Sequence, residues 1–318
     1  MSTEMMRAVR FHSFGPPEVL VVDSIPRPPS PGEGQVLVHV RAAGVNPFDV
    51  GLRAGLLQNR VPITLPGIPG VELSGTIEEV GPGVTSLVKG QAIYSNTVGN
   101  IGNGSSVEYM LLPINTVFPM PHNLDFDHAA SVAHGARTAW SGLFEYADLQ
   151  PGQRLFVQGG TGGVGMYVVQ LAHLKGAHVI TTTSTANVEF AHALGADEVI
   201  DYTQTKFDEV VKDVDMVYDN LGGEIMERSW QTLKRGGTLI SATGFPSEET
   251  ANKFGVRSAR VMFPKDLPAI LEQVTTLVEA GKLKPHIRKT FSMEQAAQAH
   301  ALCETRHGRG RIVLHIAD

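Results

Sequence analysis

Residues 155–176 read LFVQGGTGGVGMYVVQLAHLKG, and the fold is decided in this stretch. A short apolar run, LFVQ, precedes a glycine-rich turn, and the apolar segment after the turn ends at Gly176. This order predicts a strand, a tight turn and a helix. Gly160, Gly162 and Gly165 have the spacing G-x-G-x-x-G, which indicates dinucleotide binding when a strand precedes it and a helix follows.

The glycines leave the backbone of the turn exposed. Bare main-chain amides can approach a pyrophosphate closely, and the positive end of the helix dipole stabilises its charge. Packing of the helix on the strand explains Gly165 but not five glycines in seven residues. The predicted contacts to the diphosphate come from Gly160, Thr161, Gly162, Gly163, Val164 and Gly165.

The rhythm of strand and helix continues after this stretch. Further strands are predicted at 178–183, 198–202, 215–221, 235–244 and 259–263. Helices between successive strands indicate an α/β fold, with a doubly wound parallel sheet covered on both faces. We assign residues 124–264 to this dinucleotide-binding Rossmann domain.

The two ends of the chain have a different pattern. Short apolar runs separated by Gly and Pro predict a β-rich unit in the first third, with a rigid turn between two strands at 26–35. Near the C-terminus, 266–283 predicts an amphipathic helix and 311–316 a final strand. A β-rich catalytic domain is therefore predicted from residues 1–123 and 265–318.

The composition argues against several classes of partner. The 318 residues carry a formal net charge of −6 and no run of five Lys or Arg, so neither nucleic acid nor an anionic membrane is an expected partner. The sequence has no apolar run long enough for a membrane span and no signal-peptide core at its start. The single cysteine, Cys303, allows no internal disulfide, and we expect a plain helix residue in a cytoplasmic protein that binds small molecules.

The residues after the second strand of the sheet favour NADPH. A carboxylate at this place normally binds the ribose 2′-hydroxyl of NADH and repels the phosphate of NADPH. Here the strand ends TTTSTAN, and Thr183, Ser184 and Asn187 are neutral donors that do not repel a phosphate. The same stretch has no Lys or Arg, so a polar but unselective loop is the alternative.

Several stretches carry a family pattern that runs nearly from end to end. They are RAAGVNPFDVGLRAG (41–55), LPGIPGVELSGTIEEVGPGV (65–84), ARTAW (136–140), GGTGGVG (159–165), ALGADEVIDY (193–202), YDNLGG (218–223) and HGRGRIVL (307–314). Together they resemble the medium-chain dehydrogenase/reductases, and among these the zinc-free quinone and enone (alkenal) reductases. The resemblance implies a Rossmann domain, a GroES-like catalytic domain, a nicotinamide in the cleft between them, and a homodimer joined through the last Rossmann strand, near 256–263.

The resemblance also bears on metal binding. Zinc-dependent relatives hold their catalytic metal with Cys and His side chains at positions filled here by Asn46, Val71 and approximately His134. Asn and Val cannot replace a thiolate or an imidazole in a tetrahedral site, so we expect no metal and interpret His134 as a pocket or helix residue. Asp49 and Glu72 match carboxylates that support zinc in those relatives, and here we expect them to make structural hydrogen bonds.

Further site residues follow from the same resemblance. It implies that Asn46 presents its amide to the substrate or the ribose beside the nicotinamide, and that Thr138 packs near the cofactor. Further cofactor contacts are implied at Tyr202, Asn220, Leu221, Gly244, Phe245, Arg309 and Gly310. For Thr138 the alternative is a packing role, and for Tyr202 a half-buried surface position. Several relatives have Tyr or Lys where this chain has Gly51, so the proton donor and the preferred substrate size stay open.

The expected reaction follows from the absence of a Lewis acid. A plain ketone is hard to reduce without a metal because nothing strong stabilises the alkoxide. In a quinone or an enone, the charge delivered by a hydride spreads onto an oxygen that hydrogen bonds can stabilise. We therefore expect NADPH-dependent, zinc-independent hydride transfer to a quinone, enal or enone. The alternatives are another activated alkene, such as a haloacrylate or an enoyl thioester, and a non-catalytic NADPH-binding redox sensor.

Overall fold

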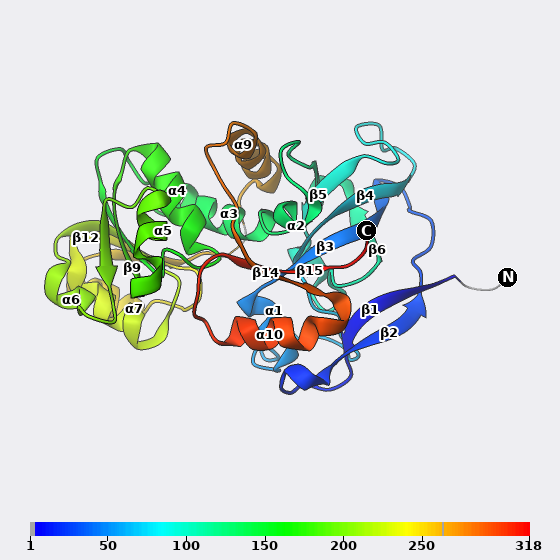
Figure 1. The fold of residues 1–318 in the computed structure, drawn as a ribbon. Coiled ribbons are helices and arrows are strands. Elements are labelled where there is room, and N and C mark those ends of the chain that lie inside the picture. The colour runs from blue at the N-terminus through cyan, green and yellow to red at the C-terminus, as the bar shows by residue number, and fades with distance from the viewer. Residues whose placement is uncertain (1–3, 263) are drawn as a thin grey trace. The chain divides into compact units, whose positions relative to one another are not determined.

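The computed structural model describes residues 4–262 and 264–318, and these residues split into two compact units. The first unit contains the residues up to His134 together with Pro285–His307 and Arg311–Asp318. The second contains Gly135–Lys284 and Gly308–Gly310. Figure 1 shows the elements of the two units, with labels where there is room. None of the helices in the described ranges has the length and apolar character that crossing a membrane requires.

The second unit is built on a parallel sheet that has six strands within the described residues. The strand order is β10-β9-β8-β11-β12-β13. The bounds are β8 (Arg154–Gln158), β9 (His178–Thr183), β10 (Glu198–Asp201), β11 (Val214–Asp219), β12 (Leu233–Ser241) and β13 (Arg257–Arg260). The order reverses between β8 and β11, the switch point outside which open α/β sheets bind their ligands. The predicted doubly wound sheet is thereby confirmed.

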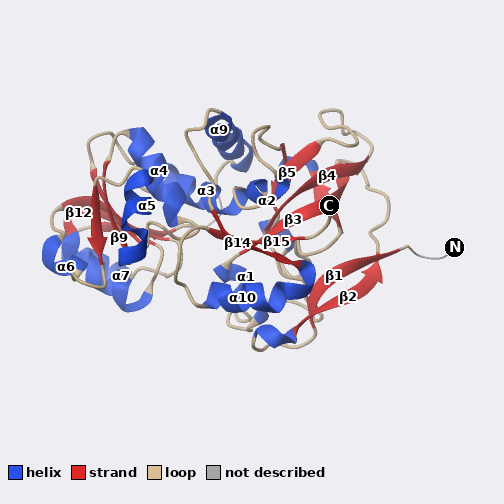
Figure 2. Ribbon diagram, in the orientation of Figure 1, coloured by secondary structure: helices blue, strands red, loops and turns tan. Residues whose placement is uncertain are grey.

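Helices alternate with these strands (Figure 2). They are α3 (Ala133–Trp140), α4 (Gly165–Lys175), α5 (Val188–Ala193), α6 (Phe207–Val210), α7 (Gly223–Ser229), α8 (Glu248–Phe254) and α9 (Leu267–Glu279), with a π-helix at Ser141–Tyr146 and 3-10 turns at Thr185–Asn187 and Trp230–Thr232. Helix α4 is buried from Gly165 to Ala172, as its nearly unbroken apolar sequence requires. It ends as predicted at Gly176, whose φ of 84° is the left-handed conformation that glycine adopts at low cost.

The last strand of this sheet begins earlier than predicted. The sequence predicts it at 259–263, whereas β13 spans Arg257–Arg260. The pairing with β12 sets these bounds, because it runs from Arg257 opposite Thr238 to Arg260 opposite Ser241, the last residue of β12. Phe263 lies outside the described residues.

The first unit is β-rich, as predicted. Its described residues form an antiparallel pair, β1 (Met5–Phe11) with β2 (Leu20–Pro26), and a sheet of seven strands in which β6 pairs with β3 beside the order β14-β15-β3-β4-β5-β7. The sheet strands are β3 (Gln35–Val45), β4 (Glu72–Val80), β5 (Ala92–Asn96), β6 (Tyr109–Pro113), β7 (Val117–Pro119), β14 (Ile287–Ser292) and β15 (Arg311–His315). Its helices are α1 (Pro47–Arg53), α2 (Phe126–Ala129) and α10 (Ala296–Glu304), with 3-10 turns at Pro17–Val19, Val98–Asn100, Ile114–Thr116 and Met293–Gln295. The C-terminal strand β15 lies between β14 and β3, so the end of the chain completes a sheet begun at its start.

The division by contacts differs from the predicted boundaries in three places, one of which is the short stretch Gly308–Gly310 that joins the second unit. Residues 265–284, which include α9, pack with the second unit instead of the β-rich one. The Gln170 side chain of α4 holds the end of this segment, since it accepts a hydrogen bond from Lys284 N at 2.8 Å and donates to Lys284 O at 3.1 Å. Residues 124–134 pack with the first unit, where Ser74 Oγ donates to Phe126 O at 2.6 Å.

Candidate functional site

The glycine turn connects β8 to α4, and its glycines serve different purposes. A Cβ atom at Gly160 would overlap Thr181 Oγ1, and one at Gly165 would overlap Gly159 O. These two glycines are therefore required by packing within the unit. A Cβ at Gly162 would meet nothing closer than Gly159 O at 3.4 Å, an ordinary contact. Internal packing does not require glycine at 162, which leaves close approach of a ligand as the physical reason for a bare backbone there.

The turn also leaves amide donors free. Gly162 N donates to Gly159 O at 3.1 Å, and Met166 N donates to Gly162 O at 3.0 Å. The amides of Gly163, Val164 and Gly165 have no acceptor among the residues that the structure describes. They lie at the N-terminus of α4, a helix of 11 residues whose dipole is positive at this end. This arrangement suits an anion such as a diphosphate.

Two predicted cofactor residues contact the turn directly. The hydroxyls of Thr161 and Thr183 lie 2.9 Å apart, and both residues are buried. Gly310 N donates to Thr161 O at 2.9 Å, which explains why 308–310 belongs to the second unit. Next to Gly310, the guanidinium of Arg309 lies over the ring of Phe190 in α5, 5.0 Å from its centroid. The stretch after β9 contains no Lys or Arg, and Arg309, which is far along the chain, brings a cation close to α5.

The loop after β9 is held by internal hydrogen bonds. Asn187 Nδ2 donates to Ser184 Oγ at 3.0 Å, and Thr185 Oγ1 donates to Asp201 Oδ2 at 2.6 Å. Asp201 ends β10, and hydrogen bonds from the Thr185 and Thr203 side chains lower the pKa of its carboxyl. Sequence reasoning missed this carboxylate, which the β9–β10 pairing brings opposite Thr183. The neighbouring Tyr202 is 50% exposed.

The carboxyl ends of β11 and β12 carry the next group of predicted residues. Asn220 Nδ2 donates to Gln158 O at 2.9 Å, which ties the end of β11 to that of β8. A Cβ on Gly159 would lie 3.3 Å from a methyl carbon of Leu221, so Leu221 lies beside the glycine turn. Phe245 is 53% exposed, and the Arg260 guanidinium lies 4.1 Å from its ring centroid. The parallel sheet thus brings residues from three separate stretches together at the carboxyl ends of its strands.

Thr138 lies in α3 and is almost fully buried. Its carbonyl accepts a hydrogen bond of 2.8 Å from the hydroxyl of Tyr218, a fully buried residue of β11. This contact is of the packing kind that the sequence left as the alternative for Thr138. Thr138 belongs to the second unit, whereas Asn46 belongs to the first.

Asn46 lies at the start of α1 inside a buried polar cluster. Its Nδ2 donates to Glu72 Oε1 at 3.0 Å, and its Oδ1 accepts from Arg311 Nη2 at 2.8 Å. Arg311 Nη2 also forms an ion pair with Glu72 Oε1, while Glu72 Oε2 accepts from His134 N at 2.8 Å. The amide of Asn46, which we expected to face the substrate or the ribose, therefore already binds one acceptor and one donor within its own unit. Sequence reasoning missed Arg311, which the pairing of β15 with β3 brings to this cluster.

The two carboxylates make the expected structural hydrogen bonds. Asp49 Oδ2 accepts from Asn46 N at 2.8 Å, and Asp49 Oδ1 accepts from Gly70 N at 3.1 Å. Burial raises the pKa of Asp49 to about 6, against the lowering effect of these two amides. Burial also lowers the pKa of Arg311 to about 10, so its guanidinium stays charged at neutral pH beside Glu72.

The positions that bind zinc in relatives do not form a tetrahedral donor set here. His134 lies in α3, and its Nδ1 is 3.3 Å from Asn96 Nδ2. Val71 is buried and has no donor atom in its side chain. Across the described ranges, no group of three His, Cys, Asp or Glu side chains is arranged for a metal ion. Asn46, Val71 and His134 therefore do not fit a catalytic zinc.

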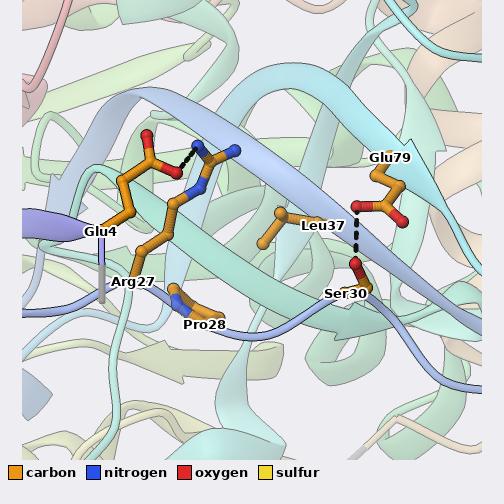
Figure 3. Close-up of a pocket in the computed structure, with 6 residues that line it drawn as sticks. All are labelled: Glu4, Arg27, Pro28, Ser30, Leu37 and Glu79. Atoms are coloured by element: carbon orange, nitrogen blue, oxygen red, sulfur yellow. Dashed lines mark hydrogen bonds and ion pairs between the residues drawn. The ribbon is translucent and has the colours of Figure 1, made fainter. Parts of the chain in front are cut away.

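A hollow of about 290 Å³ lies in the first unit, lined by Glu4, Arg27, Pro28, Ser30, Leu37 and Glu79 (Figure 3). Its polar groups are paired with one another, since Arg27 Nη1 donates to Glu4 Oε2 at 2.9 Å and Ser30 Oγ donates to Glu79 Oε2 at 3.2 Å. No residue expected to bind cofactor or substrate lines this hollow. The predicted site residues of the second unit lie at the carboxyl ends of the strands of its parallel sheet, and Asn46 lies in the buried polar cluster of the first unit.

Comparison with known proteins identifies the family of the chain. A family model described as alcohol dehydrogenase GroES-like domain matches residues 32–122, and one described as zinc-binding dehydrogenase matches residues 194–314. The chain is 33% identical to 2-methylene-furan-3-one reductase of Solanum lycopersicum, in a match that covers 98% of this chain and 79% of the relative. It is 31% identical, with the same coverage, to a chloroplastic NADPH-dependent alkenal/one oxidoreductase of Arabidopsis thaliana.

A solved structure extends the likeness to three dimensions. The quinone oxidoreductase from Coxiella burnetii matches with a TM-score of 0.89 and 31% identity, over 98% of this chain and 99% of that chain. The fold, with its parallel Rossmann sheet and its GroES-like β-rich unit, is thus shared over the whole length. These matches confirm the predicted family: the chain is an oxidoreductase that belongs to the medium-chain dehydrogenase/reductase superfamily, in the branch of the quinone and enone reductases.

Proposed function

We propose that the chain is an NADPH-dependent, zinc-independent reductase that delivers a hydride to a quinone or an α,β-unsaturated carbonyl compound. The observation that carries the proposal is the glycine turn, where packing does not require Gly162 and three helix-end amides have no acceptor within the described part of the chain. The names of the relatives support the choice of acceptor, since they include an alkenal/one oxidoreductase and a quinone oxidoreductase.

The bound nicotinamide would supply the hydride, and the residues of the chain bind and orient the cofactor and the acceptor. The amides of Gly163, Val164 and Gly165 hold the diphosphate. The loops after β9, β11 and β12 line the remaining length of the cofactor, and hydride transfer is direct. The proposed contacts are those expected from the sequence: Gly160, Thr161, Gly162, Gly163, Val164, Gly165, Thr183, Ser184, Asn187, Tyr202, Asn220, Leu221, Gly244, Phe245, Arg309 and Gly310, with Asn46 and Thr138 toward the reacting groups.

The acceptor class follows from the charges at the Asn46 cluster. Asn46, Val71 and His134 do not form a metal donor set, so hydrogen bonds have to stabilise the substrate oxygen that becomes negative. Hydrogen bonds are suited to the delocalised charge of a reduced enone or quinone. The second hydrogen of Asn46 Nδ2 is one such donor. Gly51 contributes no functional group, and a Cβ there would only touch Leu57 at 3.4 Å. Solvent is therefore the proposed proton source.

A panel of acceptors tests the function. We expect loss of NADPH absorbance with quinones, enals and enones, slower loss with NADH, and no effect of a metal chelator. A haloacrylate and an enoyl thioester belong in the panel because they represent other activated alkenes. A chelator that abolished activity would contradict the metal-free site, and tight NADPH binding without turnover on any acceptor would favour the redox sensor instead.

The preference for NADPH rests on the neutral loop after β9 and on Arg309. We expect Arg309→Ala to raise the KM for NADPH about tenfold, because a charge-assisted hydrogen bond to the 2′-phosphate is lost. The KM for NADH should change little, since NADH lacks that phosphate. Steady-state kinetics with both cofactors measure the ratio, with Arg235→Ala as an exposed-arginine control. Equal changes for both cofactors would show that Arg309 does not contact the phosphate.

Assembly and location are part of the same proposal. Strand β13 is an edge of the parallel sheet among the described residues, and an uncovered edge strand favours pairing with a second copy of the chain. We propose a homodimer joined at this edge, in a cytoplasmic protein whose single cysteine makes no internal disulfide.

Cys303 lies in α10, as expected for a plain helix residue. Burial raises the pKa of its thiol to about 12, so the reactive thiolate is scarce at neutral pH. We expect iodoacetamide at pH 7.5 to leave reductase activity unchanged and to label Cys303 slowly by mass spectrometry. Rapid labelling with loss of activity would contradict a purely structural role.

A further inference from the structure

Two short loops lie next to each other at the carboxyl ends of β11 and β12. We call residues 220–223 the first loop and residues 242–245 the second loop. A Cβ atom on Gly222 would lie 3.0 Å from Thr243 Oγ1, so the loops are in contact. They follow neighbouring strands on the opposite side of β8 from β9 and β10. A dinucleotide that crosses the switch point has one half on each side, and the nicotinamide half belongs to these loops if the adenosine half lies over β9 and β10.

The carboxylate of Asp219 holds the first loop. Asp219 is the last residue of β11 and has no exposed surface. Its Oδ1 accepts from Leu221 N at 3.0 Å and from Gly222 N at 2.9 Å. These bonds fix the backbone that leads into α7, and they place Leu221 beside the glycine turn. Capping of α7 alone would account for this much.

Ser241 extends the same carboxylate to the second loop. Ser241 Oγ donates to Asp219 Oδ2 at 2.7 Å, and it accepts from Gly244 N at 2.9 Å and Thr243 N at 3.2 Å. Because its oxygen accepts two amides, the single hydroxyl proton of Ser241 must point to Asp219. Capping of α7 does not require the bond between Ser241 and Asp219. This bond joins the first loop, which follows β11, to the second loop, which follows β12, through the buried carboxylate of Asp219.

The charge of Asp219 is balanced by neutral donors. Within the described residues its carboxylate has no Lys or Arg partner, and two amides and one hydroxyl satisfy it. An asparagine of the same shape offers one acceptor oxygen instead of two, so it cannot hold the Leu221 and Gly222 amides and also accept the Ser241 proton. A buried group left without its partner is costly, and the loops would shift to relieve it.

We propose that Asp219, acting through Ser241, is a positioning residue for the nicotinamide half of the cofactor. The pair fixes the two loops before the cofactor binds, so that little loop motion has to be lost on binding. The inference rests on the proposed function, because it presumes a dinucleotide at the glycine turn. It adds two residues, neither of which needs to contact the cofactor, to those expected from the sequence.

The experiment compares two ligands on the same variants. Calorimetry measures the Kd for NADPH and for 2′-phospho-ADP-ribose, which has the adenosine half and the diphosphate but no nicotinamide. For Asp219→Asn and Ser241→Ala we expect the Kd for NADPH to rise about tenfold, and the Kd for 2′-phospho-ADP-ribose to change less than about twofold. Ser241→Thr keeps the hydroxyl and should restore NADPH affinity.

Asp215→Asn is the matched control at the other end of β11. Asp215 Oδ2 accepts from Arg154 N at 2.8 Å and pairs with Lys234, far along the strand from the two loops. This variant should lower the melting temperature without separating the two ligands. Equal losses for both ligands in Asp219→Asn, no loss for either, or failure of both loop variants to fold would overturn the positioning role. If the wild-type chain bound neither ligand, the proposed function itself would fail, which is a different result.

Discussion

Replacement of Gly162 by valine is expected to abolish measurable NADPH binding. The valine side chain would occupy the open side of the turn, where the Gly163, Val164 and Gly165 amides have no acceptor within the described ranges. Each hydrogen bond to a charged group contributes about 1.5–3 kcal/mol, so losing two of them weakens binding about 100-fold or more. Calorimetric titration with NADPH measures the change.

The fold of the Gly162→Val variant should survive. A Cβ at this position meets nothing closer than 3.4 Å, so circular dichroism and the melting temperature should stay near those of the wild type. Gly99→Val is the matched control, because a Cβ at the exposed Gly99 has nothing within 4 Å. Unchanged NADPH affinity in Gly162→Val would show that the diphosphate does not lie on this turn.

Replacement of Arg311 by methionine is expected to destabilise the chain strongly. The substitution leaves Glu72, which has no exposed surface, without its cation, and it removes the donor to Asn46 Oδ1. Breaking a buried ion pair on one side costs about 3–5 kcal/mol, because the remaining charge is uncompensated. Urea or thermal unfolding gives the free-energy change.

Two further variants isolate the cause. The double variant Glu72→Gln with Arg311→Met removes the stranded charge, and it should regain part of the lost stability. Arg7→Met breaks the exposed pairs with Glu108 and Glu294, and it should cost about 0–1 kcal/mol for each pair. A loss in Arg311→Met no larger than in Arg7→Met would mean that Arg311 does not stabilise Glu72 and cannot hold the Asn46 amide in place.

Local pattern was enough for much of the second unit. The strand 155–158, the turn and the helix that ends at Gly176 were predictable because apolar periodicity and glycine positions act over short distances. The sequence also predicted that Asn46 and Val71 do not form a zinc site, since the donor chemistry of a side chain is set by its residue type. Alternation of strands and helices was sufficient for a parallel sheet, although it misplaced β13 by two residues at its start and three at its end.

The hydrogen-bond and packing partners of the site residues could not be predicted from local sequence patterns. The segment 265–284 is tied to the second unit through Gln170, which lies 114 residues before its hydrogen-bond partner Lys284. The contact between Arg309 and Phe190 also depends on the tertiary structure, because nothing in the stretch 184–190 indicates a nearby cation. No local motif signals the bond between Asp219 and Ser241, which requires β11 and β12 to pair in a particular register.

The sequence by itself determined the fold class, the bare glycine turn proposed to bind a diphosphate and the family of the chain. Each of these depends on residue types at fixed spacing along the backbone. Only the tertiary structure decided that Arg311 and Glu72 form hydrogen bonds with the side-chain amide of Asn46. It also decided that the carboxylate of Asp219 joins the loops after β11 and β12. Hydrogen bonds and ion pairs act over a few ångströms in space, so strand pairing between distant segments sets which polar groups meet.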